Sequence, residues 1–184
     1  PALFALLGAL PADLPVPIFV AQHIALGFTR SLVSWLSEAT KLRLAVAKDG
    51  ELARAANVYL PPDGTDLEVN SEGVIKVSVN VGGCCPSGDR LLTSLASTYG
   101  SRAGAAVLTG MGEDGARGLL AVRRRGGFAV AQDERSSVVF GMPRVAQELG
   151  AASELLPVEV IAARVARRAR YQPLPPGQIS RGAR

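Results

Sequence analysis

The chain has 184 residues, of which 48% are hydrophobic and 5% aromatic, and its formal net charge at pH 7 is +4. This length and composition allow one sizeable core, which favours a single globular domain over a disordered or fibrous protein. Glycine, proline or charged residues interrupt every apolar run well short of the roughly 18 residues that a membrane-spanning helix needs, so we expect no membrane insertion.

The basic residues and the cysteines argue against further classes of protein. Much of the positive charge lies near the C-terminus, but few aromatic residues accompany it, so we expect no nucleic-acid partner. Cys84 and Cys85 are adjacent, a spacing that suits neither a common disulfide nor a zinc site, and His23 is the sole histidine. The first residues lack the basic region of a secretory signal. We therefore expect a cytoplasmic protein without a metal or organic cofactor.

The first 40 residues follow the order helix, strand, helix. A mostly apolar segment over residues 2–10 predicts a helix, which the sequence PADLP then breaks. The apolar run 17–21 predicts a buried strand, and Gln22 and His23 follow it directly. Apolar residues at helical spacing between residues 32 and 39 predict the next helix.

Residues 42–80 change to short extended segments. Segments 42–51 and 57–64 resemble strands that end in turns. Polar and apolar residues alternate over 66–70 and 74–80, on either side of a turn that contains Gly73, as they do in a hairpin. We expect this part of the chain to form an antiparallel insertion.

Helices and strands alternate again from residue 89 onward. Apolar periodicity predicts helices over 89–99 and 115–125, and strands over 105–108 and 128–131. Two more helices are expected over 141–150 and 155–170. A final segment over 171–184, rich in proline, glycine and arginine, predicts a flexible basic tail after a domain that spans residues 1–170.

This order of elements predicts an α/β fold. We expect a doubly wound, mostly parallel sheet with helices on both faces and an inserted antiparallel β-hairpin. Such sheets bind ligands at the carboxyl ends of their strands. Polar clusters follow three of the predicted strands, at residues 22–23, 109–114 and 132–134, and parallel strands would bring them to one edge.

His23 and Asp114 are the candidate catalytic pair at that edge. A carboxylate beside a histidine fixes the tautomer of the ring and stabilises its charged form. The glycines around Asp114 would let the loop turn sharply and direct backbone N–H groups at an oxyanion. Two simpler interpretations stay open: His23 as a hydrogen-bonded structural residue, and Asp114 as an N-cap of the helix that follows it.

An acyl-transfer enzyme also needs a nucleophile, and the chain offers no clear one. None of the candidates lies in the sharp strand-to-helix turn typical of a serine nucleophile. Ser87 follows a proline and precedes a predicted helix, which favours a capping role. The candidates considered were Ser87, Ser136, Ser137, Cys84 and Cys85.

Several long motifs resemble the chemotaxis receptor methylesterases, the CheB family. They occur in the family's order over essentially the whole folded part, from Pro1 to about Val165, and are QHIALGFTRSLVSWL, VYLPPDG, PSGDRLLTSLA, VLTGMGEDGARGLLAVRRRGG and AQDERSSVVFGMPRVAQELGA. The resemblance implies hydrolysis of glutamyl methyl esters on chemoreceptors by a Ser-His-Asp triad, and in many members deamidation of receptor glutamines. Members often carry an N-terminal receiver domain as well.

Position by position, the resemblance implies His23 as the triad base, Asp114 as the triad acid and the backbone N–H of Met111 as an oxyanion donor. It places the serine about three residues before Pro1. The helical substrate is expected to contact Phe28, Thr29 and Met142, and the loop at residues 132–134.

The chain departs from the family pattern at residues 24–26, at Cys85, where arginine is usual, and at Gly88, where an apolar residue is usual. These departures bear on substrate preference more than on chemistry. One alternative is a non-catalytic binding module of chemosensory signalling, and another is a hydrolase of a different ester or amide.

Overall fold

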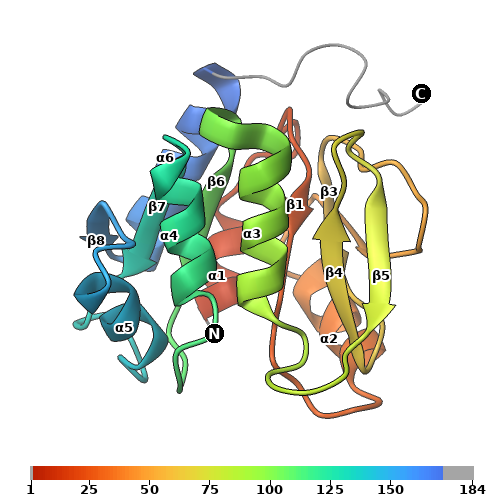
Figure 1. Ribbon diagram of the computed structural model, residues 1–184. Helices are drawn as coiled ribbons and strands as arrows, with labels where there is room; N and C mark the ends of the chain where they lie inside the picture. The colour runs from red at the N-terminus through yellow and green to blue at the C-terminus, as the bar shows by residue number, and fades with distance from the viewer. Residues whose placement is uncertain (1, 172–184) are drawn as a thin grey trace.

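Two parallel sheets form the middle layer of the molecule, as the computed structural model shows for residues 2–171 (Figure 1). Each sheet has three strands, and their orders are β1-β3-β2 and β6-β7-β8. The strands of the first are β1 (Ile18–Phe19), β2 (Arg43–Val46) and β3 (Asn57–Leu60), and those of the second are β6 (Gly104–Val107), β7 (Phe128–Gln132) and β8 (Glu154–Leu156).

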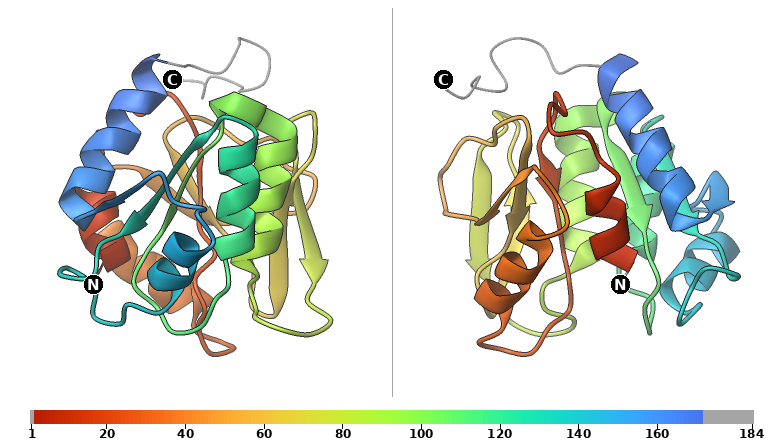
Figure 2. Two further views of the ribbon diagram at one scale, coloured as in Figure 1. Left: turned by 60° about the vertical axis from the view of Figure 1, so that its left-hand side comes forward. Right: turned by 180° about the vertical axis from the view of Figure 1, so that it is seen from behind.

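Helices cover the strands from both sides, as Figure 2 shows. Helices α1 (Ala2–Gly8), α2 (Thr29–Ser37) and α6 (Val158–Tyr171) lie on one side, and α3 (Gly88–Tyr99) and α4 (Ala116–Arg124) on the other. The short helix α5 (Met142–Glu148) packs beside α4 and β7, and a single 3₁₀ turn over Gly100–Arg102 follows α3. The predicted doubly wound α/β class is confirmed.

Each helix is held by an apolar stripe that faces the strands. In α4 the fully buried residues Ala116, Leu119 and Val122 recur every three positions, while Arg117 is mostly exposed. This spacing places the apolar side chains on one face of the helix, where burial of each large aliphatic residue contributes roughly 1.5–3 kcal/mol. Two apolar cores result, one on each side of the strands.

The predicted antiparallel hairpin consists of β4 (Thr65–Val69) and β5 (Ile75–Val79). Its turn is stabilised by Asn70, whose side-chain oxygen accepts hydrogen bonds from two backbone N–H groups of residues 72 and 74. Helix α3 packs on the hairpin, because the amide of Val69 donates to the Ser94 hydroxyl and the Thr98 hydroxyl donates to the Val69 carbonyl. The hairpin is thereby attached to the helix that follows it.

Two sequence-based expectations are corrected by the strand pairing. Segments 42–51 and 57–64 do not belong to the antiparallel insertion, since β2 and β3 pair in parallel and β3 joins β1. The last helix does not begin at residue 155, because Leu155 and Leu156 form β8 against β7. Pro157 explains this boundary: proline disfavours helical backbone at the residue before it, and the helix starts directly after it.

The expected tail at 171–184 begins with Tyr171, the last residue of α6, and its remaining part lies outside the described residues. Among residues 2–171, no helix is long and apolar enough to cross a membrane.

We predict that Gly118→Val lowers the free energy of unfolding. A Cβ atom at this position would lie 2.7 Å from the Cβ of Leu92 and 2.9 Å from the carbonyl oxygen of Asp89, so α3 and α4 would have to separate. Overpacking of this kind costs about 1–3 kcal/mol. The measurement is urea-induced unfolding followed by circular dichroism.

Arg117→Val is the matched control, because it introduces the same β-branched side chain at an exposed position of the same helix. It should cost only the difference in helix propensity, about 0.5 kcal/mol. Equal losses in the two variants would contradict a close approach of α3 and α4 at Gly118.

Candidate active site

The loops that follow β1 and β6 meet at one edge of the molecule, the lower edge in Figure 1. His23 lies in the first loop and Asp114 in the second. The Nε2 atom of His23 lies 2.8 Å from Oδ2 of Asp114. The histidine side chain is 34% exposed and the aspartate 7%, so the ring reaches solvent while the carboxylate lies beneath it. Residues 91 positions apart in sequence thus form the pair that the strand order predicts.

The N-terminus of α3 holds the Asp114 carboxylate in place. Oδ2 accepts a hydrogen bond of 2.6 Å from the amide of Gly88, and Oδ1 accepts one of 3.0 Å from the amide of Asp89. The Ser87 hydroxyl donates to Oδ1 at 3.3 Å. A helix N-terminus carries unpaired N–H groups and a partial positive charge, and both favour an anion there. The start of α3 therefore holds Asp114 in place independently of its contact with His23.

The structure shows whether Asp114 is the N-cap of the helix that follows it. Asp114 does not cap α4, whose N-cap is Gly115 and makes no side-chain capping bond. Instead, the amide of Gly118 in the first turn of α4 donates to Oδ1 of Asp89 at 2.7 Å. The two helix starts are therefore linked by reciprocal hydrogen bonds. Asp114, which precedes α4, binds the start of α3, and Asp89, at the start of α3, binds the start of α4.

These contacts move the pKa values of the pair in opposite directions. Burial alone would raise the pKa of Asp114, but hydrogen bonds from His23 and from the amides of Gly88 and Asp89 outweigh it and hold this pKa at about 2. The pKa of His23 is raised above 6.5, chiefly by its hydrogen bond to Asp114, while partial burial opposes the rise. A hydrogen bond to the Pro86 carbonyl adds to it. The carboxylate is therefore ionised at every physiological pH and favours the charged ring.

The glycine-rich loop around Met111 is held by the loop after β7. The amide of Gly110 donates to the Val139 carbonyl at 3.1 Å, and the amide of Met142 donates to the Gly110 carbonyl at 2.8 Å. Gly141 permits this approach, since a Cβ there would lie 2.6 Å from the Gly110 oxygen. Met111 itself is 82% exposed, and no partner for its amide lies within residues 2–171. That N–H group is available to a ligand at the edge.

The candidate substrate contacts differ in accessibility. Phe28 is 56% exposed directly before α2, and Met142 lines the same cavity of about 530 Å³ as His23 and Asp114. Thr29 is buried, and its hydroxyl donates to Asp63 at 2.8 Å. It lines a neighbouring pocket of about 410 Å³, but its hydroxyl is already engaged.

Gln132, in the third polar cluster, is buried and binds the loop after β6 instead of facing solvent. It is 1% exposed, and its side-chain oxygen accepts a hydrogen bond of 2.9 Å from the amide of Thr109. Its side-chain nitrogen donates to the Ser136 carbonyl at 2.8 Å. The end of β7 is thereby tied to the loop that carries Met111.

The serines considered as nucleophiles all have structural partners. Ser87 is the N-cap of α3, and its oxygen accepts from the Arg90 amide, as its position before the helix indicated. Ser136 donates to the Asp133 carboxylate and Ser137 to the Asp133 carbonyl. Of the cysteines, Cys84 is exposed, whereas the thiol of half-buried Cys85 is directed at the Thr65 carbonyl.

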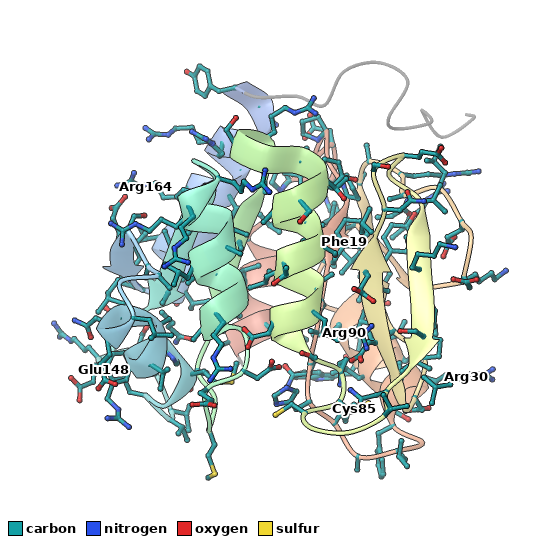
Figure 3. The ribbon with its side chains drawn as sticks, viewed as in Figure 1. Phe19, Arg30, Cys85, Arg90, Glu148 and Arg164 are labelled. Carbon is teal, nitrogen blue, oxygen red and sulfur yellow. The ribbon has the colours of Figure 1, made fainter. Side chains whose placement is uncertain are left out.

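Sequence reasoning missed a second buried carboxylate beside the site. Asp66 is fully buried in β4 and accepts hydrogen bonds from the Ser87 amide at 2.7 Å, from the guanidinium of Arg90 at 2.7 Å and from the side chain of Asn80. Figure 3 labels Arg90 on the first turn of α3 and Cys85 in the loop before it. In the sequence, Asp66 resembled one of the exposed polar residues of the alternating strand TDLEV, so nothing indicated that it is buried and needs partners.

A comparison with models of protein families shows to which family the chain belongs. The family model described as CheB methylesterase matches residues 1–165. The chain belongs to the CheB methylesterase family. This confirms the resemblance carried by its motifs.

Individual CheB-family proteins agree with this assignment. The chain is 54% identical over 158 residues to protein-glutamate methylesterase/protein-glutamine glutaminase 3 of Myxococcus xanthus, covering 86% of this chain and 44% of that protein. It is 47% identical over 156 residues to protein-glutamate methylesterase FrzG of the same organism, covering 84% of this chain and 47% of that protein. The chain therefore spans about half the length of these relatives.

A solved structure of the family has the same fold. The crystal structure of the Thermotoga maritima CheB methylesterase catalytic domain aligns with a TM-score of 0.84 and 34% sequence identity, and the alignment covers 90% of each chain.

We predict that the only histidine of this CheB-family chain titrates above pH 6.5 and that Asp114→Asn lowers its midpoint. The neutral amide still accepts a hydrogen bond but no longer stabilises the charged ring. Because the folded-state pKa of His23 is raised, its contribution to stability is complete below pH 6.5 and is lost as pH rises through the folded value. For Asp114, whose pKa is lowered to about 2, the contribution is present at neutral pH and is lost as pH falls towards 2.

The measurement is the proton NMR signal of the His23 ring in untagged protein, followed against pH. Glu113→Gln is the control, because this neighbouring acid is 72% exposed and pairs only weakly with Arg117. An unchanged midpoint in Asp114→Asn would contradict the pairing.

Proposed function

We propose that this chain is the catalytic part of a protein-glutamate methylesterase that acts in the cytoplasm on chemoreceptors, and that it also deamidates receptor glutamines. The observation that carries the proposal is the His23–Asp114 hydrogen bond at the carboxyl edge, with the carboxylate fixed by the N-terminus of α3. The names of the relatives support both activities, since they read methylesterase and glutaminase.

The proposed nucleophile is a serine that the family resemblance places about three residues ahead of Pro1. The cavity of about 530 Å³ that His23 and Asp114 line also contacts Leu3 in α1. The continuity of this cavity from α1 to the pair supports a nucleophile placed shortly before this helix.

The chemistry follows from these positions. His23 takes the proton of the serine hydroxyl as its oxygen attacks the ester carbon, and the paired Asp114 stabilises the imidazolium that forms. The Met111 N–H donates to the oxyanion of the tetrahedral intermediate. His23 returns the proton to the departing methoxide, which leaves as methanol. Water, activated by the same ring, then hydrolyses the acyl-enzyme to the glutamate carboxylate; a glutamine substrate would release ammonia by the same route.

We predict that Asp114→Asn in the parent protein lowers kcat about 10⁴-fold, because the neutral amide favours the wrong tautomer of His23. The measurement is methanol release from methylated receptor, with circular dichroism as a check of folding. Glu113→Gln, one residue away and exposed, should keep near-normal turnover. Comparable turnover in the two variants would overturn the catalytic pair.

Labelling of the same parent protein with a fluorophosphonate separates the enzyme from a binding module. One adduct on a serine just ahead of Pro1 supports the triad. Labelling at no serine, together with intact receptor binding, would favour the non-catalytic alternative.

The receptor helix is proposed to dock on the loops around the site. Large apolar side chains are exposed there, at 73% for Leu26, 56% for Phe28 and 80% for Val138. The three residues lie in the loops after β1 and β7, at the lower edge in Figure 1. Exposed apolar side chains on the loops of this edge support a surface that binds a partner.

We predict that Phe28→Ala raises KM for methylated receptor about fivefold with little change in kcat. Loss of an apolar contact worth about 1 kcal/mol weakens the ground state and the transition state equally. Val160→Ala is the control, because Val160 is 39% exposed on α6, away from the edge. A fall in kcat without a rise in KM would place Phe28 in the chemistry instead of the docking surface.

A further inference from the structure

Three metal-ligating side chains converge at the candidate active site. A ring nitrogen of His23, the sulfur of Cys84 and a carboxylate oxygen of Asp114 all lie within 4.8 Å of one another. They come from the loops after β1, β5 and β6. The proposed hydrolysis uses only the histidine and the aspartate, so it leaves the cysteine unexplained.

This set of donors suits a borderline-soft divalent cation. Zinc binds cysteine sulfur at about 2.3 Å and histidine nitrogen or carboxylate oxygen at about 2.0–2.2 Å in tetrahedral geometry. Two such donors on one ion lie about 3.2–3.8 Å apart. The histidine and the aspartate, 2.8 Å apart, would have to separate slightly, and the exposed thiol would have to move inward by up to about 1.6 Å.

Outer contacts already hold the carboxylate and the backbone that carries the thiol. Gly88 and Asp89 hold the carboxylate through their amides. The side chain of Asn80 donates to the Cys84 carbonyl at 2.9 Å and to the buried Asp66 carboxylate at 3.0 Å, which fixes the backbone that carries the thiol. Contacts of this kind are typical of metal sites, where they position the ligands.

The local charge also favours a cation. The pKa of the Cys84 thiol is raised, first by burial and then by the negative charges of Asp114, Asp89 and Glu113. The same carboxylates that oppose a thiolate attract a divalent ion. An ion that binds would displace the thiol proton to solvent, so that its positive charge compensates the new thiolate.

We propose that His23, Cys84 and Asp114 form a site for zinc or a similar divalent cation, and that an ion bound there reversibly inhibits the enzyme. The inhibitory part rests on the proposed function. An ion on Nε2, the nitrogen that now binds Asp114, would leave the remaining ring proton on Nδ1, and Nδ1 is the nitrogen that must accept the serine proton. The binding part does not rest on the proposed function. In the sequence, zinc binding was judged from the spacing of the two cysteines, whereas the proposed donors come from three separate loops.

The first test is titration of the chain with Co²⁺ under argon, with the near-ultraviolet thiolate-to-cobalt charge-transfer absorption as readout. We expect one ion per chain and an absorption that Zn²⁺ abolishes by displacement. Cys84→Ser should remove the absorption and weaken Zn²⁺ binding by at least the roughly 10- to 100-fold that is typical of outer-contact changes. Cys85→Ser is the matched control and should leave both unchanged, since that thiol faces the Thr65 carbonyl.

A second test uses turnover of the parent protein. Zn²⁺ should inhibit the wild type and Cys85→Ser, a chelator should restore activity, and Cys84→Ser should remain active at the same zinc concentration. Absence of the charge-transfer absorption, or equal zinc binding in Cys84→Ser, would overturn the proposal, whether or not the protein is a methylesterase. Binding without inhibition would overturn the inhibitory part alone.

Discussion

The capture of the Asp114 carboxylate by the N-terminus of α3 is the interaction on which the candidate site depends. Two backbone amides and one hydroxyl fix the acid before the histidine adds its own bond. Because the amides belong to the first turn of α3, the acid keeps its charge despite being 7% exposed. The orientation of His23 is therefore set by a helix of the apolar core.

A second constraint is that every amide at the start of α3 has a side-chain partner. The Ser87 amide binds Asp66, the next two bind Asp114, and the amide of Arg90 binds the Ser87 hydroxyl. A helix start usually leaves such groups to solvent or to one cap. Here the partners come from the hairpin and from the loop after β6, so the helix start joins parts of the chain that are distant in sequence.

The sequence predicted the regular elements and the His23–Asp114 pair, but missed the direction of two strands and the contacts of Asp66. Apolar periodicity located α3, α4, β6 and β7 within a residue or two, because burial of one face determines where such elements form. The pairing of β2 and β3 was wrong because short strands do not encode the direction of their neighbours. The His23–Asp114 pair followed from the strand order. The role of Asp66 depends on tertiary contacts that one segment of sequence does not show.

The hairpin β4-β5 lies beside the parallel sheets, yet its buried Asp66 binds the same helix turn as Asp114. A change at Asp66 would thus disturb the start of α3, and with it the position of Asp114, without contacting substrate. Asp66 shares its face of β4 with the partly exposed Glu68, and both carboxylates bind Arg90. The outer surface of this insertion is therefore linked to the candidate site through one arginine, so that substitutions there need not be neutral for the reaction.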